Sequence, residues 1–90
     1  MTTVQDIADY LESFAPASLA EEWDNVGLLV GNPGQPVQRL MTCLTITAES
    51  AKEAIDRNAE MIITHHPLPF RPLKRLTTTE TASRLLLQLI

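Results

Sequence analysis

The stretch Leu40–Thr64, LMTCLTITAESAKEAIDRNAEMIIT, decides the fold. Its first eight residues, LMTCLTIT, form an apolar run rich in β-branched side chains, which is typical of a strand buried on both faces. Its last five residues, EMIIT, predict a second short buried strand. Two such strands close together in the sequence need a connection, and the residues between them predict its form.

That connection has the pattern of a short helix. Thr47 is the predicted N-cap, and Asn58 is a suitable left-handed stop after the last turn. The small apolar side chains that recur at helical spacing are Ala48, Ala51, Ala54 and Ile55. Strand, helix and strand within about two dozen residues predict a βαβ unit, with parallel strands and a right-handed crossover.

A helix is predicted on each side of this unit. Before it, Thr3 is a predicted N-cap, Asp6 occupies the capping-box position and Pro16 ends the helix. The apolar residues of that first helix are Val4, Ile7, Ala8, Leu11 and Phe14. After the unit, Thr77 and Glu80 have capping-box spacing, and the apolar residues that follow are Ala82, Leu85, Leu86, Leu87, Leu89 and Ile90.

The last predicted helix is apolar nearly all round toward its end, and such a helix expects cover on several sides. One βαβ unit with two flanking helices cannot supply all of that cover. The sequence therefore predicts an α/β chain in which residues 1–90 form a single, partial domain. This domain is expected to be the amino-terminal portion of a larger fold or to be completed by a partner chain.

Composition excludes several classes of function. The chain has 7 Lys and Arg against 11 Asp and Glu, a formal charge of −4. Without a basic stripe, we expect binding neither to nucleic acid nor to an anionic membrane surface. A single cysteine, Cys43, allows no internal disulfide, and the first residues lack a signal-peptide pattern. These features predict a cytoplasmic protein.

The segment between the first helix and the βαβ unit contains a second polar motif. Gly27–Val30 predicts a short strand, and Asn32–Gly34 predicts a turn. Trp23, Asp24 and Asn25 precede that strand in a predicted loop. The polar residues Asp24 and Asn25 can belong to a functional loop, but an Asx-type turn anchored by Trp23 is the favoured interpretation.

Both histidines of the chain, His65 and His66, directly follow the second predicted strand. Open parallel sheets place their ligands beyond the carboxyl ends of the strands. Neighbouring side chains in extended backbone diverge, so each histidine could hold one ion of a two-metal site. The alternatives are a backbone-capping and surface role, or a histidine general base. Cys43, inside a predicted strand, is expected to be a small core residue rather than a nucleophile.

Three motifs together resemble the NIF-three-like proteins, often named GTP cyclohydrolase 1 type 2 homologues. They are EEWDNVGLLVG (Glu21–Gly31), TITAES (Thr45–Ser50) and IITHHPLPF (Ile62–Phe70), in the family's order and approximate spacing. The resemblance covers essentially the whole chain, but only the amino-terminal part of a typical member.

The resemblance implies a dinuclear metal protein with an α/β core, usually assembled as a homo-oligomeric hexamer. His65 and His66 would each bind one of two divalent ions, such as zinc, iron, nickel or manganese. The family's other ligands, an aspartate, a histidine and a glutamate, belong to later segments that these 90 residues do not contain. Many members also carry an aspartate where this chain has Thr45.

The function implied by the resemblance is a metal-dependent hydrolase, in which metal-activated water attacks a nucleotide-like small molecule. The alternative is a non-enzymatic metal-binding or protein-interaction module that acts through its oligomer surfaces. Metal-dependent turnover that disappears in the variant His65→Ala would distinguish the enzyme from the module.

Overall fold

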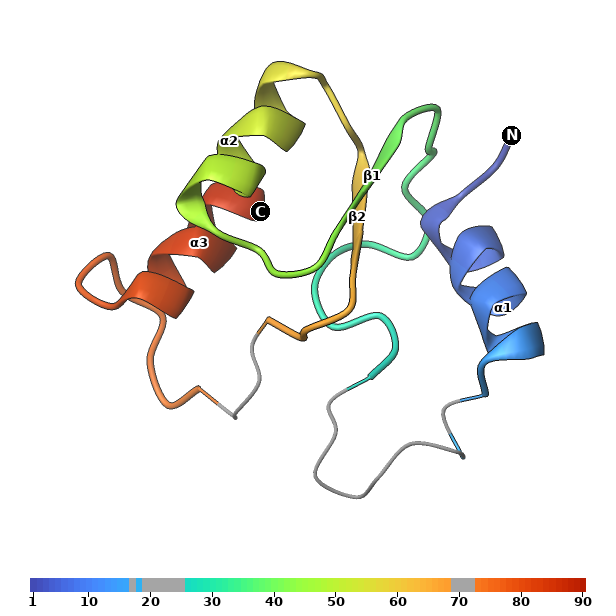
Figure 1. Ribbon diagram of the computed structural model, residues 1–90, viewed down its shortest axis with the longest axis horizontal. Helices are drawn as coiled ribbons and strands as arrows, with labels where there is room; N and C mark the ends of the chain where they lie inside the picture. Colours follow the sequence, from blue (N-terminus) through green and yellow to red (C-terminus); the bar gives the residue numbers. More distant parts are fainter. Residues whose placement is uncertain (17, 19–25, 69–72) are drawn as a thin grey trace.

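The computed structural model describes residues 1–16, 18, 26–68 and 73–90. The described elements, in chain order, are α1 (Val4–Phe14), β1 (Leu40–Cys43), α2 (Ala48–Asp56), β2 (Met61–Thr64) and α3 (Thr81–Leu89). In Figure 1, α2 and α3 lie to one side of the two strands and α1 lies to the other. The predicted loop residues Trp23, Asp24 and Asn25 lie outside the described residues. In the described part of the chain, no helix has the length and apolar character needed to cross a membrane.

The predicted βαβ unit is confirmed. β1 and β2 pair in parallel, with Leu40 opposite Met61 and Cys43 opposite Thr64. Helix α2 connects them, as a parallel pair requires. β1 is shorter than the predicted strand 40–47: the regular strand ends at Cys43, and residues 44–47 lead to the start of α2.

The predictions that the first strand is buried on both faces and that the second is buried are wrong. β1 alternates between exposed and half-buried residues, with Leu40 45% exposed, and β2 is half-buried throughout. Among the described elements, extensive contacts join only β1 with β2 and α2 with α3, so no described helix packs closely over a face of the two-stranded sheet. An apolar β-branched run therefore indicated strand but not depth of burial.

Helix α2 begins and ends as predicted. Thr47 Oγ1 accepts a hydrogen bond from Ser50 N (3.1 Å), and Thr47 N donates to Ser50 Oγ (2.8 Å), which completes a capping box. At the other end Asn58 has a φ of 58°, the left-handed geometry expected of a helix stop. Ala51 and Ala54 are buried, whereas Ile55 is exposed and lies outside the buried stripe.

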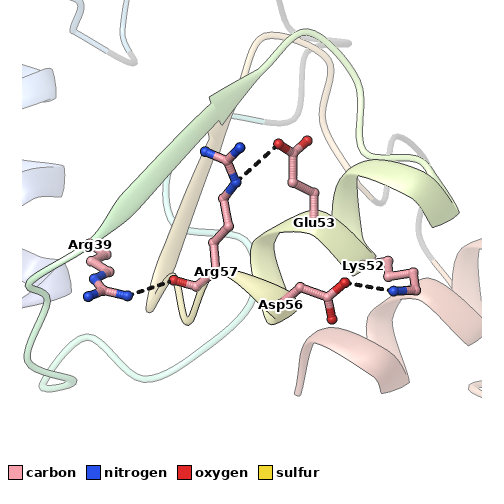
Figure 2. Close-up of polar contacts among 5 residues, drawn as sticks. All are labelled: Arg39, Lys52, Glu53, Asp56 and Arg57. Carbon is pink, nitrogen blue, oxygen red and sulfur yellow. Dashed lines mark hydrogen bonds and ion pairs between the residues drawn. The ribbon is translucent and has the colours of Figure 1, made fainter.

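Polar contacts fasten the carboxyl end of α2 to the start of β1 (Figure 2). Arg39 Nη1 donates to the backbone carbonyl of Arg57 (3.1 Å), a favourable position for a cation because carbonyls at a helix end carry negative charge. Arg57 pairs with Glu53 (3.3 Å) and Lys52 with Asp56 (2.6 Å), each one helical turn apart. Such exposed pairs contribute little to the stability of a helix, because water and salt screen them.

Glu60 joins the beginnings of the two strands. Its Oε1 accepts hydrogen bonds from Gln38 N (2.8 Å) and Arg39 N (3.1 Å), while its own N–H donates to Arg39 O (2.9 Å). The hydrogen bond from Gln38 and then that from Arg39 lower the pKa of the Glu60 carboxyl. Both favour the ionised form, so the carboxylate is part of the strand junction.

The predicted first helix is also confirmed. Thr3 and Asp6 form the expected capping box, with Asp6 N donating to Thr3 Oγ1 (3.2 Å) and Thr3 N donating to Asp6 Oδ2 (2.9 Å). The start of α1 is tied to the segment before β1, since Val4 N donates to Gln35 O (2.9 Å). Val4 and Val37 are buried at this junction.

Gly27–Val30 is not a strand, contrary to the prediction. Gly27 has a φ of 102°, outside the range of extended backbone, and the described strands do not pair with this segment. The turn that follows is confirmed: Gln35 N donates to Asn32 O (3.1 Å), and Asn32 Oδ1 accepts from Gly34 N (2.9 Å). The side chain of Asn32 thus closes an Asx turn.

The predicted capping box of the last helix is wrong. Glu80 itself is the N-cap of α3 and makes no side-chain capping bond, while Thr77 Oγ1 contacts Thr79 Oγ1 (2.8 Å). Because Glu80 is the N-cap, its side chain cannot complete a capping box from the third position of the helix. Leu85 and Leu86 are buried, and α3 contacts α2.

We expect the substitution Leu86→Ala to lower the free energy of unfolding by about 2–5 kcal/mol, because it removes a buried side chain and leaves a cavity. Leu86 is 5% exposed, whereas its neighbour Leu87 is 41% exposed. Leu87→Ala is thus a matched control, with an expected loss of about 0.5 kcal/mol. Urea unfolding followed by circular dichroism measures both. Equal losses would contradict the described packing of α3.

The Glu60 carboxylate predicts a pH dependence of stability. Because its folded-state pKa lies below the ordinary value of 4.5, its contribution is present above that pH and is lost as the pH falls through the lowered pKa. The stability of the parent chain should therefore fall more steeply below pH 4.5 than that of Glu60→Gln. Glu80→Gln, at a position without a capping bond, should keep the steep fall. Parallel curves for all three chains would refute the role of Glu60.

Candidate functional site

The carboxyl ends of the two strands meet at one edge of the sheet. Cys43 and Thr64, the last residues of β1 and β2, are partners in the parallel register. The loop 44–47 leads from β1 into α2, and residues 65–68 leave β2 beside it. The sequence analysis predicted a site at this edge, and the structure places both histidines there.

Backbone hydrogen bonds continue past the ends of the strands. His65 N donates to Cys43 O (3.3 Å), and His66 N donates to Leu44 O (2.9 Å). The main chain of both histidines is therefore held against the end of β1. This explains how two exposed residues acquire a defined position outside regular secondary structure.

Thr64 reinforces this edge with its side chain. Its Oγ1 lies 2.9 Å from Leu44 O and 3.0 Å from His66 O, so its single hydroxyl proton is shared between two backbone carbonyls. One acceptor belongs to the loop after β1 and the other to the histidine pair. The hydroxyl thus links the two segments that form the candidate site.

The two imidazole rings lie next to each other and are exposed. Their centroids are 5.1 Å apart, and the ring planes meet at 71°. Nδ1 of His66 is 2.7 Å from Thr45 Oγ1, a hydrogen bond between residues 21 positions apart in the sequence. From the sequence, Thr45 was identified only as a departure from a family pattern. The parallel register of the strands is the signal that could have placed it beside His66.

Chemically, the edge offers two imidazole groups and several hydroxyls. The described residues contain no group of three or more His, Cys, Asp and Glu side chains that could surround one metal ion. A hollow of about 520 Å³ lies along β1 and α2 and includes neither histidine in its lining. The candidate site is therefore an open edge with two donors, and metal binding by His65 and His66 stays a prediction.

Comparison with known proteins identifies the family. The family model Duf34/NIF3 (NGG1p interacting factor 3) matches residues 2–90. The chain belongs to this family. The resemblance inferred from the three sequence motifs is thereby confirmed.

Named relatives of this NIF3-family chain come from bacteria and animals. It is 40% identical over 87 residues to a GTP cyclohydrolase 1 type 2 homolog of Clostridium acetobutylicum, covering 97% of this chain and 32% of that protein. It is 41% identical over 75 residues to NIF3-like protein 1 of Drosophila melanogaster, covering 82% and 26% respectively. The chain thus spans about a third or less of the length of these relatives.

Solved structures confirm the α/β fold as that of NIF3 proteins. Staphylococcus aureus protein SA1388 matches with a TM-score of 0.92 and 35% identity, over 98% of this chain and 28% of that one. A Bacillus cereus protein related to NIF3 gives a TM-score of 0.90 and 35% identity, over 99% and 25%. Reduced HcgD from Methanocaldococcus jannaschii gives 0.87 and 31%, over 98% and 35%.

The Thr64 hydroxyl yields a prediction about order at the edge. Thr64→Val keeps the shape of the side chain but removes the donor to Leu44 O and His66 O. A net loss of about 1 kcal/mol should make the His66 amide exchange with deuterium roughly fivefold faster. Thr42→Val, at an exposed position of β1, should leave that rate unchanged. The same His66 exchange rate in both variants would show that the hydroxyl does not hold the edge.

Proposed function

We propose that this NIF3-family chain supplies two histidine ligands to a pair of divalent metal ions. The single observation that carries the proposal is the His65–His66 pair, exposed and neighbouring on a backbone held by the end of β1. Rings with centroids 5.1 Å apart can each serve a different ion when the two ions lie about 3.5–4 Å apart. If both histidines bound the same ion, their two imidazole rings would instead have to point toward one shared position.

The chemistry of these donors supports divalent transition metals. Neutral imidazole nitrogen suits zinc, iron and nickel, and added carboxylate ligands would suit manganese as well. The two histidines fit part of such a site. In the proposal, further ligands come from outside the described residues, either from the rest of a longer protein or from other copies in a homo-oligomer. We also propose that the protein is cytoplasmic. A chain with one cysteine can form no internal disulfide, and this is typical of proteins in a reducing compartment.

The proposed reaction is metal-dependent hydrolysis of a nucleotide-like small molecule. Divalent ions in such a site supply Lewis acidity and make water acidic enough to react near neutral pH. The names of several relatives, GTP cyclohydrolase 1 type 2 homolog, support this class of reaction. The role of this chain is to hold two imidazoles at a fixed separation at an open edge, where a substrate can approach.

A second candidate is a non-enzymatic module for protein interaction. The family description NGG1p interacting factor 3 supports it, and so do exposed apolar residues at the start of β1, in the loop after β1 and at the end of α3. Examples of these residues are Leu40, Leu44, Leu87 and Ile90. Both candidates can use the same metal site, so only turnover separates them.

The metal-ligand assignment predicts that His65→Ala and His66→Ala each lower the Zn²⁺ retained per chain to about half or less, because each removes the imidazole that serves one of the two ions. Native mass spectrometry of the purified chains measures bound metal and subunit number together. Cys43→Ser is the matched control, since it removes the only cysteine but neither imidazole. Circular dichroism should show that all three variants keep their helices.

Unchanged zinc content in both histidine variants would refute the ligand assignment. If the parent chain hydrolyses GTP only with metal, and His65→Ala abolishes this activity, the hydrolase is supported. Zinc binding that depends on the histidines, without turnover of guanine or adenine nucleotides, would favour the interaction module.

A further inference from the structure

The His66 ring is held through one of its two nitrogens. Nδ1 lies 2.7 Å from Thr45 Oγ1, in the loop that follows β1. This contact leaves Nε2 for another partner. His65 differs, because the hydrogen bonds among the described residues include none to its ring, which lies beside the ring of His66. The two members of the pair are therefore not equivalent.

The Thr45 contact is built into the edge on both sides. Ser50 Oγ, in the first turn of α2, donates to Thr45 O (3.4 Å). His66 N donates to Leu44 O, directly before Thr45, and Thr64 Oγ1 bridges Leu44 O and His66 O. These hydrogen bonds hold the backbone next to Thr45 against the backbone of His66. They therefore bring the Thr45 hydroxyl within reach of Nδ1 of His66.

We infer that Thr45 is the positioning residue of His66 and makes Nε2 the nitrogen that binds a divalent metal. A coordinating imidazole needs a lone pair on one nitrogen and carries its proton on the other. In the tautomer that binds metal through Nε2, Nδ1 of His66 carries the proton and donates it to Thr45 Oγ1, which leaves the lone pair on Nε2. The inference rests on the proposed metal-binding function, and it adds a residue that is not itself a ligand.

The chemistry of position 45 sets how strictly this tautomer is enforced. A hydroxyl can accept a proton from Nδ1 or donate its own, so both neutral tautomers of His66 stay accessible. A carboxylate can only accept and would force the proton onto Nδ1. A valine can do neither. Zn²⁺ affinity should therefore be highest with Thr45→Asp, intermediate with threonine or Thr45→Ser, and lowest with Thr45→Val.

The first test uses the metal-free chain. Long-range ¹H–¹⁵N correlation spectra, recorded at mildly alkaline pH, report which nitrogen of His66 carries the proton. Thr45→Asp should show the Nδ1–H tautomer almost alone, and Thr45→Val the Nε2–H tautomer that a free histidine side chain favours in water. The His65 signals should not change. An identical His66 tautomer mixture in both variants and the parent chain would overturn the inference.

The second test adds Zn²⁺ alone. Thr45→Val should raise its dissociation constant about tenfold, while Thr45→Ser restores the parent value and Thr42→Val, on β1, leaves it unchanged. In the loaded parent chain the ¹⁵N shifts should identify Nε2 of His66 as the bound nitrogen. If Zn²⁺ binding depends on the histidines but its dissociation constant is the same in Thr45→Val as in the parent chain, the inference is overturned and the proposed function stands. Binding unaffected by both His65→Ala and His66→Ala overturns the proposed function, and the inference with it.

Discussion

The parallel register that sets Cys43 opposite Thr64 is the constraint on which the candidate site depends. Because the ladder continues as backbone hydrogen bonds from His65 to Cys43 and from His66 to Leu44, it places the two histidines against the loop after β1. A shift of one residue would turn every side chain of a strand to the opposite face. Such a shift would remove the Thr64 hydroxyl from its two carbonyls.

Hydrogen bonds order this edge more than burial does. Among the described residues, the buried apolar ones are few and lie elsewhere: at the start of α1, before β1, and on α2 and α3. A chain of this size buries only about two-thirds of its surface, so its margin of stability is thin. The capping box of α2, the Arg39 contact with the helix end (Figure 2) and the Glu60 junction therefore do much to hold the unit in shape.

Features that depend on a few neighbouring residues could be predicted from the sequence. The N-caps at Thr3 and Thr47 and the left-handed stop at Asn58 follow from local chemistry, and all three were confirmed. The capping box predicted from Thr77 and Glu80 failed although its spacing is local, because Glu80 is itself the N-cap of α3. Two other predictions failed because they needed distant information. Whether an apolar run is buried depends on how many strands flank it, and a strand at Gly27–Val30 would have needed a partner that the described residues do not provide.

The sequence by itself determined that both histidines directly follow a strand of a βαβ unit, and hence that they lie at the carboxyl edge of a parallel sheet. It also carried the motifs that identify the NIF3 family. Only the tertiary structure decided that Thr45 contacts Nδ1 of His66 and that the two rings lie 5.1 Å apart. Residues 21 positions apart meet because the strands pair in one register, and no pattern of neighbouring residues encodes that distance.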